Sequence, residues 1–108
     1  TQAVICVLGG WAMVTQSTPT EIYKVGLNST RLLMMMGDLV VGYLLLKQSE
    51  IASKALAAGP AAKDVAFYQG KVAAASWFAT NRLPLLAAER VVCESTTLDL
   101  MDLPEADF

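Results

Sequence analysis

The sequence contains few residues that could carry out a reaction. It has no histidine, so nucleophilic catalysis by a Ser-His or Cys-His pair is excluded, as are most zinc sites. Its two cysteines, Cys6 and Cys93, stand far apart in apolar stretches and form no metal-binding motif. We expect both to be free, buried thiols of a protein in the reducing cytoplasm. The residues by themselves indicate no catalytic, cofactor-binding or metal site.

Asp38 is the one charged residue in the apolar stretch from 32 to 46. A carboxylate in such a stretch is costly to bury unless it is paired. Arg31 lies seven positions earlier on the same helical face, and Arg82 or Lys71 could reach Asp38 from a second helix. A catalytic carboxylate is the alternative interpretation. We expect instead a buried structural ion pair or hydrogen-bond acceptor.

Two glycines, Gly37 and Gly42, flank this aspartate. Together they would form a smooth strip on which another helix could pack closely. No strand pattern precedes them, so a nucleotide-binding loop has almost no support. We therefore expect both glycines to have a packing role.

The apolar stretch from 32 to 46 is too short for a membrane span, which needs about 20 apolar residues. Arg31 precedes it and Lys47 follows it. A helix that is apolar around most of its circumference is more often buried between neighbouring helices. We expect no membrane span.

Apolar residues recur at helical spacing in three parts of the chain, over residues 2–16, about 18–58 and about 61–90. Pro84 should kink or break the third helix, because it removes a backbone donor and clashes with the preceding turn. No long stretch alternates with period two. The sequence therefore predicts an all-α protein, an up-down antiparallel bundle of three to four helices with short loops.

The second helical stretch opens on a capping signal, in which Thr18 caps and Glu21 completes a capping box. It forms either one long helix or a short helix to about Val25 followed by a longer one, with Gly26 as the joint. Gly59-Pro60 should end it. In the third stretch, alternate three- and four-residue spacing predicts the packing seam, and adjacent aromatic pairs add core residues. The seam residues are Val65, Tyr68, Val72, Ala75 and Ala79, and the aromatic pairs are Phe67-Tyr68 and Trp77-Phe78.

Hydrophobic residues make up 55% of the chain and charged ones 17%, whereas an ordinary soluble domain has about 25% charged residues. This surplus of apolar residues points to a partner, which could be another domain, another subunit or a membrane. The chain begins at Thr1 inside an apolar-periodic segment. We expect it to be part of a larger protein.

Charge is distributed unevenly along the chain. Residues 1–93 hold eight basic and five acidic residues, whereas residues 94–108 hold five acidic residues and no basic one. The formal net charge of −2 argues against nucleic acid as a partner. We expect a helical bundle domain over residues 1–93 and an acidic tail over 94–108. The tail is either solvated or docked on a basic groove through its apolar residues, which are Leu98, Leu100, Met101 and Leu103.

Four stretches, residues 21–34, 37–46, 63–75 and 94–103, have a familiar sequence. They resemble the extra C-terminal helical domain of a subgroup of acyl-CoA dehydrogenases, best known from actinobacteria. Phe-Tyr-Gln-Gly-Lys-Val-Ala-Ala-Ala, which starts at Phe67, is the most specific part. Ser76-Trp77 departs from the pattern, which has Arg followed by Phe. The resemblance covers nearly the whole chain from Thr18 onward.

The resemblance implies a flavoenzyme as the parent protein. Such enzymes use FAD to oxidise the Cα–Cβ bond of an acyl-CoA thioester, while a glutamate removes the α-proton. That glutamate and most FAD and CoA contacts belong to preceding domains, so no catalytic residue is carried onto this chain. The implied partners are those domains, further copies in a homodimer or larger homo-oligomer, and acyl-CoA bound by the parent. A stand-alone helical interaction module and a membrane-associated helical protein are the alternatives.

Overall fold

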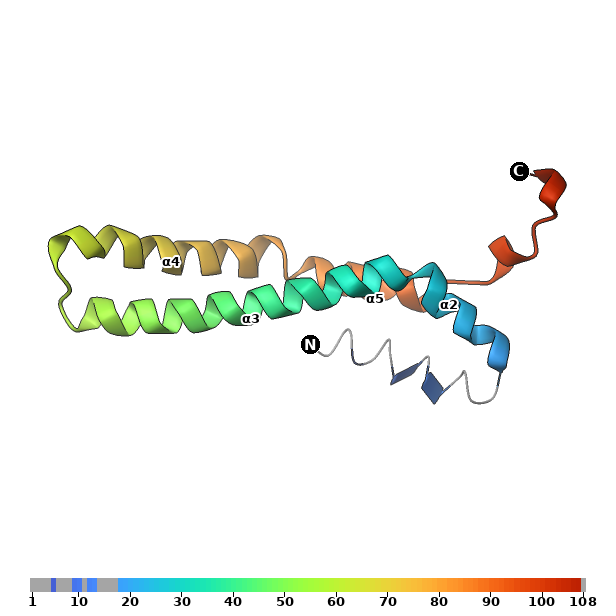
Figure 1. Cartoon of the computed structure of the whole chain (residues 1–108), viewed down its shortest axis with the longest axis horizontal. Coiled ribbons are helices and arrows are strands. Elements are labelled where there is room, and N and C mark those ends of the chain that lie inside the picture. Colours follow the sequence, from blue (N-terminus) through green and yellow to red (C-terminus); the bar gives the residue numbers. More distant parts are fainter. Residues whose placement is uncertain (1–4, 6–8, 11, 14–17, 108) are drawn as a thin grey trace. The chain divides into compact units, whose positions relative to one another are not determined.

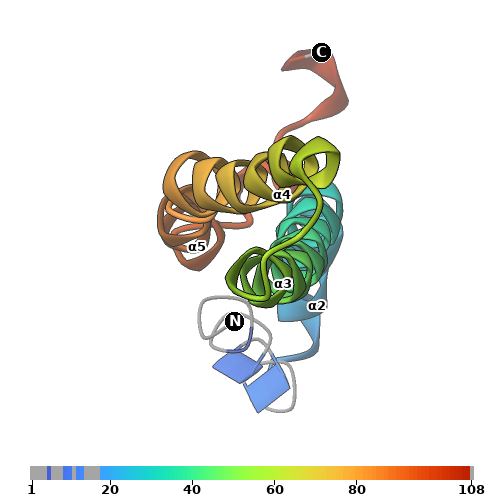
Figure 2. The ribbon, with the colours of Figure 1, turned by 90° about the vertical axis from the view of Figure 1, so that its left-hand side faces the viewer.

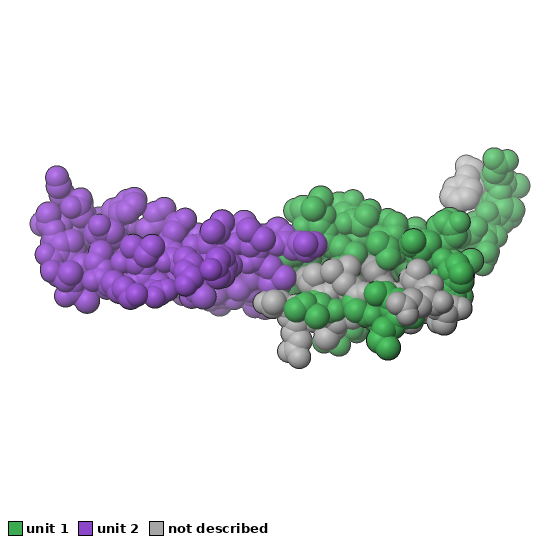
Figure 3. Space-filling model, turned by 60° about the horizontal axis from the view of Figure 1, so that its bottom comes forward, with its two compact units in different colours: residues 1–35, 86–108 green, residues 36–85 purple. Residues whose placement is uncertain are grey.

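The computed structural model describes Ile5, Gly9, Gly10, Ala12, Met13 and residues 18–107 (Figure 1). Within these residues all regular secondary structure is helical, which confirms the prediction of an all-α helical bundle. The helix expected over residues 2–16 lies largely outside the described residues, and so does Cys6. The chain forms two compact units, residues 36–85 and residues 1–35 with 86–108 (Figure 3).

The unit of residues 36–85 is an antiparallel helical hairpin. Its first arm is the larger part of α3 (Ser29–Ala57), and its second arm is α4 (Ala62–Asn81). The two helices lie side by side (Figures 1 and 2). Gly59 has a φ of 74°, a left-handed conformation that glycine adopts without strain, and Pro60 follows it. Gly59-Pro60 therefore ends the helix, in agreement with the prediction.

Close contact between the two arms centres on Gly42. A Cβ atom at this position would lie 3.1 Å from Cδ2 of Leu83 and 3.4 Å from Cε1 of Phe78. These two side chains occupy the space that a larger residue in α3 would need. Gly42 therefore sets how closely the end of α4 and the turn after it approach α3.

The seam of α4 agrees with the predicted spacing at four of its five positions. The half-buried residues are Val65, Tyr68, Val72 and Ala75. The fifth, Ala79, is exposed, and the half-buried Phe78 takes its place. The other aromatics of each pair, Phe67 and Trp77, are exposed, so the prediction that they belong to the core is wrong. A helix with one neighbouring helix buries only one side.

The same argument corrects the prediction for the apolar stretch from 32 to 46, which we expected to be buried between neighbours. Leu32 and Met35 are buried, but most of the large apolar side chains between them and Lys47 are exposed. α3 meets the length and composition of a membrane span, so the prediction that the apolar stretch is too short for one is wrong; 11% of its most apolar window is buried. Among the described helices it is the only one that meets this length and composition.

The other unit combines α2 (Ile22–Leu27), the start of α3 and α5 (Leu85–Glu94), of which residues 86–94 belong to it. The predicted break at Pro84 is present, since residues 82–84 separate α4 from α5. α5 extends to Glu94, four residues beyond the predicted end. Leu86 and Cys93 of α5 are buried in this unit.

The joint between α2 and α3 is at Asn28, so the alternative of a short helix followed by a longer one is correct, with a different joint from the predicted Gly26. Asn28 is buried, and its Nδ2 donates to the carbonyl oxygen of Lys24 at 3.1 Å and to Oγ1 of Thr96 at 2.8 Å. A side chain that links two separate parts of the chain thus stands where the helix is interrupted.

The start of the chain's second helical stretch also differs from the prediction. Pro19–Glu21 is a 3₁₀ turn, and in the described structure the Thr18 side chain makes no capping hydrogen bond. The Glu21 carboxylate pairs with Lys24 instead of completing a capping box. At the other end of the chain, Asp99–Met101 and Glu105–Asp107 form 3₁₀ turns.

Gly42→Leu is expected to destabilise the isolated chain by about 1–3 kcal/mol, because its side chain would collide with Leu83 and Phe78. Gly37→Ala is the matched control on the same helix. A Cβ at Gly37 meets no atom of the described structure within 4 Å, so the free energy of unfolding should rise by about 0.5–1 kcal/mol. Urea denaturation of both variants measures the difference. Equal effects at the two positions would contradict the close approach at Gly42.

Asn28→Ala is expected to lower the free energy of unfolding by about 1–3 kcal/mol, because it removes a buried side chain that makes two hydrogen bonds, one of them to Thr96 in a distant part of the chain. Thr96→Val removes one of these acceptors and should have a smaller effect. Thermal unfolding followed by circular dichroism compares the two variants with the unchanged chain. If both variants have the same melting temperature as the unchanged chain, the hydrogen bond between Asn28 and Thr96 does not stabilise the fold.

Candidate functional site

Asp38 forms an ion pair with Arg82 inside the hairpin unit. Nη2 of Arg82 lies 2.9 Å from Oδ2 of Asp38. The Asp38 side chain is 19% exposed and that of Arg82 40% exposed, so the pair is half-buried, whereas we expected Asp38 to be buried. Arg82 follows directly after α4, which places its guanidinium beside the α3 carboxylate.

The other two basic residues considered as partners of Asp38 contact different groups. Arg31 pairs with Glu89 of α5, within the other unit. Lys71 donates from Nζ to Oε1 of Gln48 at 3.2 Å. The predicted partners of Asp38 therefore included the observed one, Arg82, but Glu89 was not predicted as the partner of Arg31. The spacing of the charges could have revealed it, because Arg31 and Asp38 are seven residues apart, as are Arg82 and Glu89.

The two glycines that flank Asp38 do not form one strip. Gly42 faces Leu83 and Phe78, whereas a Cβ at Gly37 has no neighbouring atom within 4 Å in the described part of the chain. Gly37 therefore lies on a different side of α3 from Gly42. Packing within the hairpin explains a glycine at position 42 but not at position 37.

The described residues offer little for ligand chemistry. They contain no group of three or more metal-binding side chains. A groove of about 180 Å³ lies between the two arms of the hairpin near their connecting loop. It is lined by Gln48, Ile51, Ala52, Phe67, Tyr68 and Lys71, and its surface is almost wholly apolar. Small-molecule sites usually measure about 300–1,000 Å³, so this groove does not fit a dinucleotide such as FAD.

Cys93 is the described thiol, and burial raises its pKa. The carboxylates of Glu89 and Glu94 raise that pKa further, while the guanidinium of Arg31 opposes the shift. A buried thiol that stays protonated is a poor nucleophile. Cys93 therefore has the properties of a core residue.

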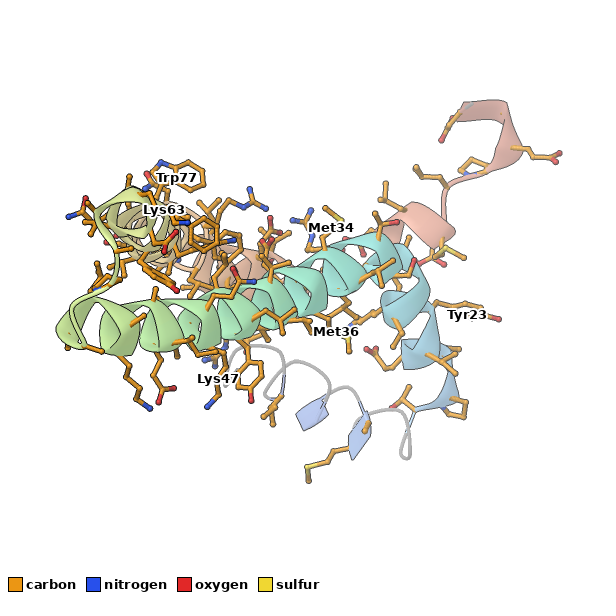
Figure 4. All side chains as sticks on the ribbon, turned by 60° about the vertical axis from the view of Figure 1, so that its left-hand side comes forward. Tyr23, Met34, Met36, Lys47, Lys63 and Trp77 are labelled. Carbon is orange, nitrogen blue, oxygen red and sulfur yellow. The ribbon has the colours of Figure 1, made fainter. Side chains whose placement is uncertain are left out.

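The side of α3 that faces away from α4 is the surface of the hairpin that is available to a partner. We name Met36, Gly37, Val40, Tyr43 and Leu44 the outer stripe. The four large side chains of the outer stripe are each 50–59% exposed. Met36, and Lys47 beyond the stripe, project away from α4 (Figure 4). This apolar, uncharged surface is the candidate functional site.

Comparison with known proteins gives the chain a family. Residues 2–104 match the model of the family described as "Acetyl-CoA dehydrogenase C-terminal like". The chain is also 48% identical over 107 residues to the broad-specificity linear acyl-CoA dehydrogenase FadE5 of Mycobacterium tuberculosis. That match covers 99% of this chain but 18% of the relative, in its C-terminal portion.

The family match spans nearly all of the chain, including the hairpin and the outer stripe of α3. It agrees with the resemblance found in the sequence. The chain therefore belongs to the family of C-terminal domains of acyl-CoA dehydrogenases.

Proposed function

We propose that this chain is the accessory C-terminal domain of an FAD-dependent acyl-CoA dehydrogenase, which oxidises the Cα–Cβ bond of acyl-CoA thioesters in fatty-acid β-oxidation. Its own task is packing on the preceding domains or association of subunits. The observation that carries the proposal is the 48% identity to the C-terminal portion of a much longer acyl-CoA dehydrogenase.

The size and lining of the hairpin groove support this division of labour between the chain and the preceding domains. The hairpin groove is too small and too apolar for FAD, and no step of the oxidation is assigned to this chain. FAD, acyl-CoA and the base belong, in this proposal, to the preceding domains of a cytoplasmic homo-oligomer. No membrane span and no nucleic acid take part.

Residues 94–108 are proposed as an acidic tail that follows a domain of residues 1–93. Glu94 is the last residue of α5 and Thr96 accepts a hydrogen bond from Asn28, so the solvated part of the tail begins after Thr96. Support comes from the exposure of the tail's own apolar side chains. Leu100 and Met101 are more than half exposed, and Leu103 is also exposed. Acidic residues alternate with them along the tail, which keeps the segment soluble.

Asp38 and Arg82 are proposed as a structural pair that fixes the register of the hairpin. An ion pair with one half-buried carboxylate is worth more than a fully exposed pair, because solvent screens it less. Arg31, Lys71 and Gly42 have structural roles in the same proposal through the contacts described above, and Gly37 has one through the open side of α3, where no described atom lies within 4 Å of a Cβ.

Asp38→Ala is expected to lower the free energy of unfolding by about 1–2 kcal/mol, since it leaves the half-buried guanidinium of Arg82 without its partner. A double-mutant cycle with Arg82→Ala isolates the energy of the pair. Glu50→Ala, in a fully exposed group of charges on the same helix, is the control and should change stability little. A coupling energy of zero between positions 38 and 82 would refute the register role.

The complete gene product that contains this chain is expected to bind FAD and to oxidise acyl-CoA when a dye accepts the electrons. The isolated chain of residues 1–108 should bind no flavin and show no turnover in the same assay. Flavin absorbance and dye reduction measure both. Turnover by the isolated chain, or a complete gene product without flavin, would contradict the proposed function.

A further inference from the structure

We propose that the outer stripe of α3 is the surface with which this chain docks on an apolar surface of the domains that precede it in the same polypeptide. The inference rests on the proposed function and adds to it the contact face and the chemistry of the partner surface. The uncharged outer stripe has no side chain that would pair with an ionic group. The partner surface must therefore be apolar too.

Exposure of the stripe is the first observation. Met36, Val40, Tyr43 and Leu44 are each at least half exposed, and they stand next to one another at helical spacing. Each large apolar side chain that leaves water on docking favours the contact. Contiguous apolar patches of this kind usually mark a contact surface.

Gly37 is the second observation. Glycine inside a helix destabilises it relative to alanine. At Gly42 the closeness of Leu83 and Phe78 explains why a glycine is needed. At Gly37 no described atom lies within 4 Å of where a Cβ would be, although exposed apolar side chains flank the position. A glycine here leaves room for an outside surface to approach the backbone of α3.

Charge marks where the stripe ends. Lys47 follows Leu44 on the same side of α3, and its ammonium lies 5.9 Å from the ring centre of Tyr43. Glu50 then pairs with Lys47 at 3.6 Å and with Lys54 at 2.8 Å. The hydrogen bond and the charge of Lys54, with the charge of Lys47, lower the pKa of the fully exposed Glu50. This charged end of α3 faces solvent, so docking is confined to the stripe.

The outer side of α4 is the rival surface. Trp77 is exposed there and projects away from α3 (Figure 4), while the other exposed aromatic residue of α4, Phe67, lines the groove between the two arms. They are ten residues apart, however, and the ammonium of Lys71 lies 5.4 Å from the ring centre of Phe67. Lys63 and Asn81 are exposed on the same helix. This surface combines charged, polar and apolar side chains, so it is better solvated than the outer stripe.

The size of the stripe decides between a preceding domain and a second copy of the chain. Nine residues, from 36 to 44, extend over about 12 Å of helix. A patch this short is smaller than the roughly 800 Å² per partner that stable complexes between separate chains bury. A covalently joined partner has an effective concentration near millimolar, so a small surface is sufficient. The relative offers such a partner, because the matching portion is 18% of its length.

The test uses Val40→Cys, with Trp77→Cys on the rival surface as the matched control. Each variant is prepared in the complete gene product and in the isolated chain, and maleimide labelling of the introduced thiol is followed by peptide mass spectrometry. We expect labelling at position 40 to be about 10-fold slower in the complete protein than in the isolated chain, and labelling at position 77 to agree within about 2-fold. The buried Cys93 gives little background.

Gly37→Leu gives a second, independent readout. In the isolated chain it should not lower the melting temperature, because the described structure leaves space at this position. In the complete protein it should remove most of the protection at position 40. A lower melting temperature of the isolated variant would mean that the chain itself covers the stripe, and would overturn the inference.

Equal labelling at position 40 in both molecules would also overturn the inference, as would protection at position 77 in place of position 40. Protection at position 40 that appears in the isolated chain with rising concentration would assign the stripe to a second copy instead. Dye reduction by the same preparation separates the two proposals. An active, flavin-containing protein with an unprotected position 40 refutes only the docking surface, whereas a complete protein without flavin refutes the proposed function.

Discussion

The hairpin of residues 36–85 depends on the close approach of the two helices at Gly42. Because this residue has no side chain, Phe78 and Leu83 can lie directly against α3. Asp38 lies four residues before Gly42, and Arg82 lies four residues after Phe78. The ion pair therefore forms one helical turn away from the close contact. A shift of the helices by one turn, about 5.4 Å, would break the pair and bring a larger α3 residue against Phe78. The small residue sets the distance between the helices, and the ion pair opposes such a shift.

The order of the charges along the chain favours the same antiparallel arrangement. Arg31 precedes Asp38 by seven residues, and Arg82 precedes Glu89 by seven residues. When the second segment runs back along the first, each arginine can meet a carboxylate, as both do within their own units. A parallel arrangement would oppose arginine to arginine and carboxylate to carboxylate, which is unfavourable. The pair of Arg31 with Glu89 was not predicted, because partners were considered for Asp38 alone. Seven residues span about 10.5 Å of helix, too far for Arg31 and Asp38 to pair directly.

Short sequence motifs predicted the ends of helices where the backbone of the motif itself determines them. Gly59-Pro60 ends α3 and Pro84 precedes α5 because the backbone of these residues restricts what the chain can do. The joint at Asn28 could not be found in this way. Its side chain is held by Thr96, 68 residues away, whereas Gly26 is merely permissive. Thr18 shows a different limit, because two local interactions compete there: Glu21 pairs with Lys24, three residues later, and forms no capping box. A long-range partner decides the joint at Asn28, and a single sequence does not display that partner.

The surplus of apolar residues and the two glycines of α3 are parts of one explanation. A single neighbouring helix covers one side of α3, so a helix that is apolar around its circumference must leave its other side uncovered. The composition indicated that such a surface exists, but it could not say where, because a bundle with more helices would have buried it. Gly37 locates it: a residue that weakens the helix is found on the uncovered side, among large apolar side chains and before the charged end. α3 is thus built to pack on both sides, with Gly42 fitted to α4 and Gly37 suited to a surface beyond the hairpin.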